Sequence, residues 1–308
     1  MLKFVVRRVL WTIPIILLVI FMTFWMMRAI HGSPFRRSDK AVPPAVLANL
    51  NRNFGLDKPW YVQYYRYVKG VATLNLGPSL VLRDQGVNDI VKEHFPVSAE
   101  LGAWAMLLAM LVGIPLGIIS ALRVNTIFDY AGQFISNLGF AIPSFFTATL
   151  LIYFFAAKWR FFPTSGWGPP SSKILPVIAL SLFPLTYFAR LVRGQMLETL
   201  QQDYVRTAKA KGLHWRRVVV VHVLRNSLIP AITAAGPILG AIVTGSFIIE
   251  NIFAIPGIGR YYVTSVEGRD YSTVMGITVL YAILIIVANM FVDITYGILD
   301  PRTRDART

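Results

Sequence analysis

Side chains that often do chemistry are few and scattered in this sequence. The chain has 308 residues, no Cys and four His, so disulfides and thiolate metal sites are excluded. His31, His94, His214 and His222 lack the spacing of metal ligands. A Gly-x-Ser-x-Gly motif is missing, and no His lies in the long apolar segments, where an intramembrane hydrolase would need its base. These observations argue against an enzyme.

The composition instead places much of the chain in lipid. Hydrophobic residues make up 55% of the sequence, charged residues 15%, and the mean hydropathy is +0.57, whereas about a quarter of a soluble domain is charged. A membrane-spanning helix needs roughly 20 apolar residues. Six charge-free windows predict an all-α integral membrane protein with six transmembrane helices: Val9–Met27, Leu101–Leu122, Tyr130–Ala157, Ile174–Ala189, Asn226–Ile249 and Tyr271–Val292. Since the fourth is short and contains Pro176 and Pro184, we expect it to be kinked or tilted.

Lys and Arg in the connections predict the orientation. The net charge is +15, and positive residues concentrate on the cytoplasmic side of membrane proteins. Lys3, Arg7 and Arg8 place the N-terminus in the cytoplasm, and six crossings return the C-terminus there. The charge therefore fits a membrane surface better than nucleic acid. We expect a signal-anchor helix in residues 1–30, an extracytoplasmic segment in 31–98, and a five-helix core in 99–308.

The connection between the fourth and fifth windows contains two short cytoplasmic helices, at 203–225. Asp203 is a suitable N-cap for the first helix, and Gly212 is suited to the left-handed position after its end. A second amphipathic piece follows from His214 to Arg225. Two short helices that meet at a glycine predict a compact projection, and a connector lying on the membrane surface is the alternative.

At this projection the sequence resembles the inner-membrane permease subunits of ABC importers. Their signature is Glu-Ala-Ala, three residues, then Gly, and here Arg206, Thr207, Ala208 and Gly212 occupy those positions, with Arg in place of Glu and Thr in place of the first Ala. Both departures resemble the dipeptide and oligopeptide branch, whose Tyr-Val-Arg-Thr-Ala-x-Ala-Lys-Gly run is matched from Tyr204 onwards. Further landmarks of this branch extend the resemblance over nearly the whole chain: Phe54–Pro59, Gly113–Gly117, Ile142–Phe145, Arg225–Pro230, Pro256–Arg260 and Leu299–Arg302.

The resemblance implies a type I ABC importer permease-like fold and a non-catalytic transport subunit of the bacterial inner membrane. It implies a second homologous permease, two P-loop ATPases that bind ATP and Mg²⁺, an extracytoplasmic solute-binding protein, surrounding lipid, and no cofactor in this chain. No Gly-Lys dipeptide occurs here, so the chain has no P-loop of its own. The residues implied to couple with an ATPase are Tyr204, Arg206, Thr207, Ala208, Lys211, Gly212 and Leu213.

The resemblance also implies that the third and fifth spans lie at the translocation pathway. The candidates for the path or its gate are Phe140, Pro143, Ser144, Thr244 and Phe247, although small and hydroxyl residues in spans commonly serve helix packing. Glu250, at the outer end of the fifth span, is a candidate contact for the solute-binding protein.

Short peptides are the implied solute. Nickel, glutathione and haem are alternatives, because importers of this branch also carry them. An ATP-independent channel or secondary transporter is a different class, and several charges in mid-span would favour it. No charged residue lies inside any of the six windows, so the importer subunit is preferred.

Overall fold

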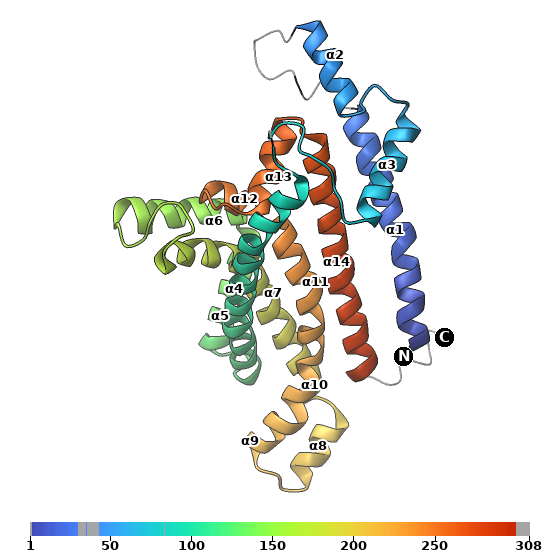
Figure 1. Ribbon diagram of the computed structural model, residues 1–308. Coiled ribbons are helices and arrows are strands. Elements are labelled where there is room, and N and C mark those ends of the chain that lie inside the picture. The colour runs from blue at the N-terminus through green and yellow to red at the C-terminus, as the bar shows by residue number, and fades with distance from the viewer. Residues whose placement is uncertain (1, 30–34, 36–42, 83, 300–308) are drawn as a thin grey trace. The chain divides into compact units, whose positions relative to one another are not determined.

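The computed structural model of the protein describes residues 2–29, 35, 43–82 and 84–299 (Figure 1). Within these ranges the chain is helical and forms no strand beyond an isolated bridge between Pro78 and Gly86. The predicted all-α architecture is confirmed. The helices are α1 (Leu2–Ala29), α2 (Pro44–Asn53), α3 (Trp60–Ala72), α4 (Val87–Leu122), α5 (Ile127–Ala141), α6 (Ser144–Leu151), α7 (Pro170–Leu200), α8 (Asp203–Ala210), α9 (Trp215–Arg217), α10 (Arg225–Ser227), α11 (Ile229–Gly245), α12 (Phe247–Ile252), α13 (Ile258–Glu267) and α14 (Tyr271–Leu299), with π-helical segments at Ile152–Lys158 and Val218–Leu224.

The chain divides into two compact units. The first joins Met1–Ser98 to Pro256–Val287, and the second joins Ala99–Ile255 to Ala288–Thr308. The first unit thus combines residues from both ends of the sequence. This division describes compactness alone, and the predicted domain roles stay predictions.

Five helical stretches among the described residues are long and apolar enough to cross a membrane, and a sixth is bent. Each predicted window overlaps one of them, because the absence of charge over about 20 residues is the same property that a bilayer selects. The five stretches are Leu10–Ala29, Val87–Leu122, Pro170–Leu200, Trp215–Ile252 and Tyr271–Met290, and the bent one joins Ile127–Ala141 to Ser144–Lys158.

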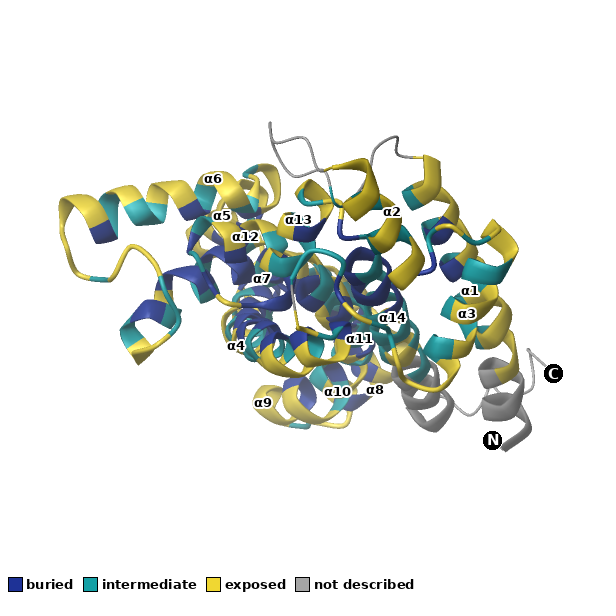
Figure 2. Cartoon of the chain, turned by 45° about the horizontal axis from the view of Figure 1, so that its top comes forward, coloured by how far each residue is buried: buried dark blue, intermediate teal, exposed yellow. Residues whose placement is uncertain are grey.

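The third window differs from a simple span. Its two halves, α5 and the α6 stretch, meet at an angle of 102°. Pro143 lacks a backbone N–H and disfavours helical geometry in the residue before it, and Ile142 accordingly has an extended backbone with φ −88° and ψ 120°. Figure 2 shows exposed residues mixed with intermediate and buried ones along α6. By contrast, the fourth window lies in α7, one continuous helix with Pro176 and Pro184 inside it.

Close helix packing defines the second unit. Gly113 and Gly117 of α4 face the backbone of α7, where an added Cβ would lie 2.4 Å from the Leu185 oxygen and 2.5 Å from the Ala189 oxygen. Small residues allow backbones to approach in this way inside a membrane, where packing rather than the hydrophobic effect holds helices together. The C-terminal half of α4 is therefore fixed against α7.

In the first unit, polar contacts hold the segment before α4 to the start of α14. The Ser79 hydroxyl donates to the buried carboxylate of Asp270, and the Leu80 N–H donates to the same group over 3.0 Å. The Thr273 hydroxyl donates to it over 2.8 Å. Asp270 thus serves both the helix start and the segment before α4.

Candidate functional site

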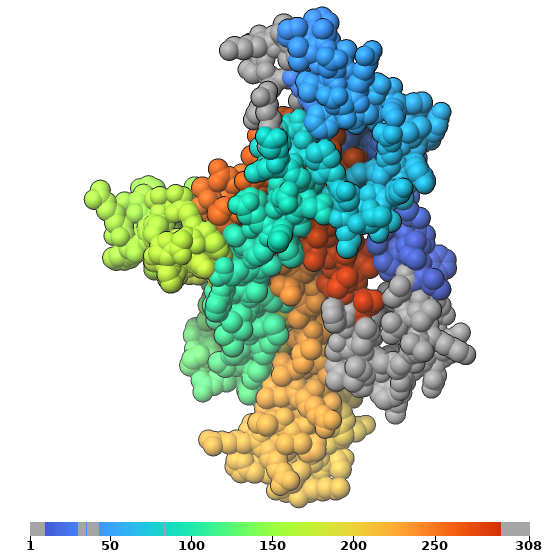
Figure 3. Space-filling model, in the orientation of Figure 1, coloured from blue at the N-terminus to red at the C-terminus, as the bar shows by residue number. Residues whose placement is uncertain are grey.

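Residues 203–227, named here the elbow, form a lobe of the second unit. Figure 3 shows the elbow projecting beyond the neighbouring ends of α4 and α5. It consists of α8, a glycine corner, α9, the π-helical segment and α10. The sequence allowed two alternatives for this connection, a connector lying on the membrane surface and a compact projection. The structure has the geometry of the compact projection.

A glycine corner ends α8. Gly212 has φ +76°, in the left-handed region that a Cβ disfavours. Its N–H donates to the Lys209 oxygen over 3.0 Å, and the Leu213 N–H donates to the Ala208 oxygen over 3.3 Å. These two bonds form a Schellman motif, which satisfies carbonyls at the helix end and fixes the direction of the following chain.

The start of α8 differs from the prediction by one residue. Gln202 is the N-cap, with no side-chain cap bond, and Asp203 is the first helical residue. There its carboxylate still complements the positive end of the helix dipole. The Thr207 hydroxyl donates to the Asp203 oxygen over 2.9 Å, and the exposed Arg206 guanidinium lies 3.7 Å from the Asp203 carboxylate.

A small apolar core stabilises the elbow from inside. Val205 and Ala208 of α8 are buried, as are Val218 and Val223 of the π-helical segment, which packs against α8. Apolar burial of this kind holds two short helices that would be marginal alone.

Two further contacts tie α8 to its neighbours. The Asn226 side-chain amide donates to the Tyr204 hydroxyl over 2.9 Å. The Lys209 ammonium lies 4.7 Å from the centre of the Trp215 ring, a cation–π distance. Together with the buried valines, these contacts hold the glycine corner and the surface around it in one conformation.

The outer face of the elbow is basic and aromatic. Of the predicted coupling residues, Ala208 is buried and Leu213 is half-buried, while the others are exposed. The exposed ones are Tyr204, Arg206, Thr207, Lys211 and Gly212. Such a face is suited to an acidic or polar groove on a protein partner.

The predicted pathway residues lie on α5, α6, α11 and α12, of which α6 and α12 pack together. Pro143 and Ser144 form the break that begins α6, and Phe247 begins α12, which packs against α6. Phe140 is 52% exposed and its ring stacks on Phe183 at 5.5 Å. The Thr244 hydroxyl donates to the Gly240 oxygen of its own helix over 2.9 Å, a bond typical of hydroxyls in spans. Their role in a pathway stays a prediction.

Glu250 is placed differently from the expectation of a contact at the surface. Its side chain has 0% exposure, and its carboxylate accepts a hydrogen bond from the Ser246 hydroxyl. In this conformation the carboxylate offers no surface to a separate protein, because α12 turns it inward. The contact with a solute-binding protein stays a prediction, without support from this geometry.

One ion pair was not predicted from the sequence. Asp129 of α5 is fully buried and receives two bonds from the Arg193 guanidinium of α7, over 2.7 Å and 2.8 Å. Asp129 directly precedes the third apolar window, and Arg193 follows the fourth window by four residues. Opposite charges near these two window ends were the available signal. Among the described residues, no group of three His, Asp or Glu is arranged to hold a metal ion.

The sequence matches two protein families. Residues 113–305 match the family described as the inner membrane component of binding-protein-dependent transport systems. Residues 1–101 match the N-terminal family of such membrane components. Together the matches cover most of the chain.

Proteins of similar sequence cover the chain from end to end. It is 44% identical over 304 residues to the dipeptide transport system permease protein DppB of Bacillus subtilis, covering 99% of this chain and 98% of that protein. It is 43% identical over 306 residues to the oligopeptide transport system permease protein OppB of Salmonella typhimurium, covering 99% and 100%.

Solved structures share the fold at low sequence identity. A chain of the MetNI methionine ABC transporter in an inward-facing conformation superposes with a TM-score of 0.55 at 16% identity, over 68% of this chain and 96% of that one. A chain of an amino acid ABC transporter gives 0.55 at 14% identity, over 67% and 92%.

Proposed function

Because this chain belongs to the family of inner membrane components of binding-protein-dependent transport systems, we propose that it forms half of the translocation pathway of an ATP-driven importer of short peptides. The resemblance inferred from the elbow motif is thereby confirmed at the level of the family. The observation that carries the proposal is identity above 40%, over essentially the full length, to permeases of dipeptide and oligopeptide systems.

The elbow is the proposed contact with a cytoplasmic ATPase. Its support is physical: the Schellman corner at Gly212 fixes the direction of the chain, and Val205 packs against the following segment. The exposed side chains of Tyr204, Arg206 and Lys211 then present one shaped face. A rigid projection transmits a displacement, whereas a loose connector absorbs it.

A small contact surface can supply the free energy that such coupling requires. Shifting a transporter from 1:99 to 99:1 between two conformations needs about 5.5 kcal/mol of differential binding. A single interface hot spot contributes about 2 kcal/mol or more when truncated. Three such hot spots, spread over two elbows with one from each permease, would therefore supply about that amount.

The proposal includes partners and an orientation. ATP and Mg²⁺ would bind to two P-loop ATPases, a homologous permease would supply the other half of the pathway, and a solute-binding protein would deliver peptides from outside. The N- and C-termini and the elbow would face the cytoplasm, since Lys and Arg gather in these connections.

The first experiment is an affinity purification of the tagged chain from its native membrane in mild detergent, followed by mass spectrometry. We expect a second permease and P-loop ATPases in the eluate. The purified complex is then placed in liposomes with its binding protein and radiolabelled trialanine. ATP-dependent uptake of trialanine supports the proposal.

Other outcomes separate its parts. ATP-dependent uptake of nickel, glutathione or haem, without uptake of trialanine, would reject the peptide substrate and keep the importer. A lone chain that moves solute without ATP would reject the importer in favour of a channel or secondary transporter.

A further inference from the structure

An ion pair with a buried carboxylate and a half-buried guanidinium joins three helices of the second unit. The Arg193 side chain of α7 donates through Nε and Nη2 to the two carboxylate oxygens of Asp129, over 2.7 Å and 2.8 Å. The Ser120 hydroxyl of α4 donates to the same carboxylate, and the Asn125 N–H does so over 3.1 Å. A bidentate pair of this kind fixes orientation as well as distance.

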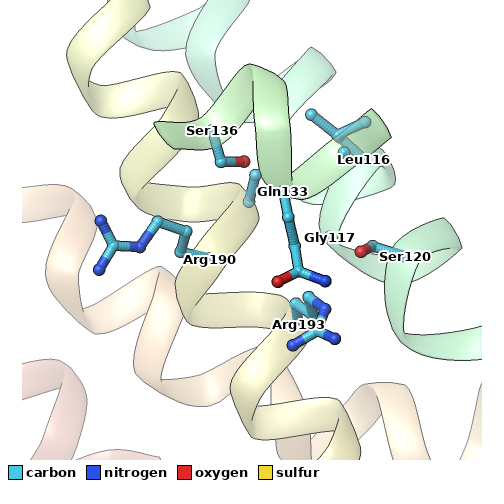
Figure 4. A pocket seen from close by; sticks show the side chains of 9 residues that line it. Leu116, Gly117, Ser120, Gln133, Ser136, Arg190 and Arg193 are labelled. Carbon is cyan, nitrogen blue, oxygen red and sulfur yellow. The ribbon is translucent and has the colours of Figure 1, made fainter. Parts of the chain in front are cut away.

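The surroundings of the pair leave little freedom. Asp129 has 0% exposure, and the neighbouring cavity holds about 10 Å³, the room of a single water. Figure 4 shows the Gln133 side chain pointing toward Arg193, while Arg190 points away from the cavity. A buried charge that loses its partner is costly, so the three helices keep this arrangement as one body.

The pair lies on the route from the elbow to the break in the third span. Arg193 is two helical turns before the end of α7 at Leu200, and α8 begins at Asp203. Asp129 lies in the first turn of α5, whose other end is the 102° bend at Ile142 and Pro143. When α8 is displaced and moves α7, α5 therefore follows only while the ion pair holds α5 to α7.

We propose that the Asp129–Arg193 pair is a positioning device for transport, which makes α4, α5 and α7 follow α8 as one body and carries its displacement to the start of α6. The inference rests on the proposed function, because an ATPase is what displaces α8. Neither residue touches the solute in this role. The pair sets how much solute movement each ATP hydrolysis yields.

The chain offers a matched control. Glu100 of α4 and Lys173, in the first turn of α7, form a second ion pair, at the end of α7 opposite to the elbow. Glu100 is 41% exposed, whereas Asp129 is fully buried. Glu100→Gln removes the carboxylate of a pair between α4 and α7, and Asp129→Asn removes the carboxylate of a pair between α5 and α7. The two variants make the same chemical change, but Glu100 lies away from the elbow.

The experiment measures coupling in the whole complex. Wild type, Asp129→Asn, Arg193→Gln, the double variant and Glu100→Gln are placed in liposomes with the partner subunits and the binding protein. Trialanine uptake and ATP hydrolysis are measured together. We expect trialanine moved per ATP to fall about tenfold in either single variant, the size of a coupling between residues in contact. The double variant should be no worse than the singles, and Glu100→Gln should match wild type.

A second measurement needs no solute. Because the chain has no Cys, spin labels can be attached through Phe134→Cys on α5 and Glu198→Cys on α7, both at exposed positions. In wild type the distance between the labels should be the same with and without ATP and vanadate. In Asp129→Asn the distance should change or broaden when ATP is trapped.

Several results would overturn the inference. One is an Asp129→Asn complex with the wild-type uptake per ATP and the wild-type label distances. Another is an equal loss in Glu100→Gln. A third is a lower amount of variant protein whose surviving complexes are fully coupled, because the pair would then serve stability alone. If the wild-type complex moves no trialanine, the peptide substrate is wrong, and the label distances still decide on the pair.

Discussion

Gly212 shows how one residue can decide the shape of a site. Its φ of +76° belongs to the left-handed region, and a Cβ built on it would meet no atom within 4 Å. A side chain there is therefore opposed by backbone strain alone, of about 1–2 kcal/mol for an L-residue. β-Branched residues suffer most, while Asn tolerates the conformation.

We predict that Gly212→Val abolishes peptide uptake and leaves membrane insertion intact. The strain is relieved when the corner opens, which re-aims Leu213 and the helix after it. Uptake in liposomes and the amount of protein in the membrane measure the two effects. Gly212→Asn should keep most of the uptake.

Gly166→Val is the matched control for this prediction. Gly166 has φ +100° and also leaves open space for a Cβ, but it lies in the loop before α7. It imposes similar strain away from the elbow, so uptake should persist. Wild-type uptake by Gly212→Val would remove the elbow from the coupling mechanism.

Tyr67 of α3 gives a second prediction at this scale. Its phenolic oxygen is buried, and none of the described residues forms a hydrogen bond with it. Burial raises the pKa of Tyr67, so the folded state favours the neutral phenol. The protein should lose stability as the pH rises above about 10, the ordinary value.

Tyr67→Phe should therefore be more stable than wild type by about 1 kcal/mol, because it removes a buried and unpaired hydroxyl. Its thermal unfolding in detergent should also depend less on pH above pH 10. Tyr65→Phe is the control, since Tyr65 is 66% exposed. A destabilised Tyr67→Phe would mean that the hydroxyl has a partner in solution.

At the scale of elements, local signals predicted local structure. The lack of charge in the six windows predicted each long apolar helical stretch of the described residues. Gly212 predicted the end of α8, since a glycine corner is encoded by neighbouring residues. The helix start was missed by one residue because Asp is favourable both as an N-cap and in the first turn of a helix. Pro143 marked the break in the third span, but the 102° angle depends on packing that local signals do not encode.

The Asp129–Arg193 ion pair could not be predicted from local sequence signals. Asp129 and Arg193 are 64 residues apart, and only the packing of α5 on α7 brings them together. The same holds for Glu250, whose position at the outer end of a span suggested exposure, while α12 buries it. Long-range pairing requires the tertiary arrangement.

Packing of α4 on α7 yields a prediction for the elements themselves. We expect Gly117→Ala to destabilise the protein by about 1–3 kcal/mol, the cost of overpacking, because its Cβ would lie 2.5 Å from the Ala189 oxygen. Gly194→Ala on α7 should instead stabilise by about 0.5–1 kcal/mol, because a Cβ there meets nothing within 4 Å. Thermal unfolding in detergent compares the two, and equal effects would contradict the close approach of α4 and α7.

At the scale of the whole molecule, the open question is whether the bent third stretch crosses the membrane. The described helices allow five crossings, or six when α5 and the α6 stretch form one span. Between α3 and the elbow lie α4, the bent stretch and α7. Three crossings put α3 and the elbow on opposite sides, and two put them on the same side. The elbow lies in a connection rich in Lys and Arg, which favours the cytoplasm and hence three crossings.

We therefore predict that single cysteines at Tyr65 and Thr207 react from opposite sides of the membrane. Both positions are exposed and the chain contains no Cys of its own, so each variant carries one reactive thiol. A maleimide that does not cross membranes should label Tyr65→Cys in right-side-out vesicles and Thr207→Cys in inverted vesicles. Labelling of both from one side would make the bent stretch a re-entrant loop. An elbow on the outer side of the membrane could not contact a cytoplasmic ATPase. ATP hydrolysis in the cell could then not displace α8.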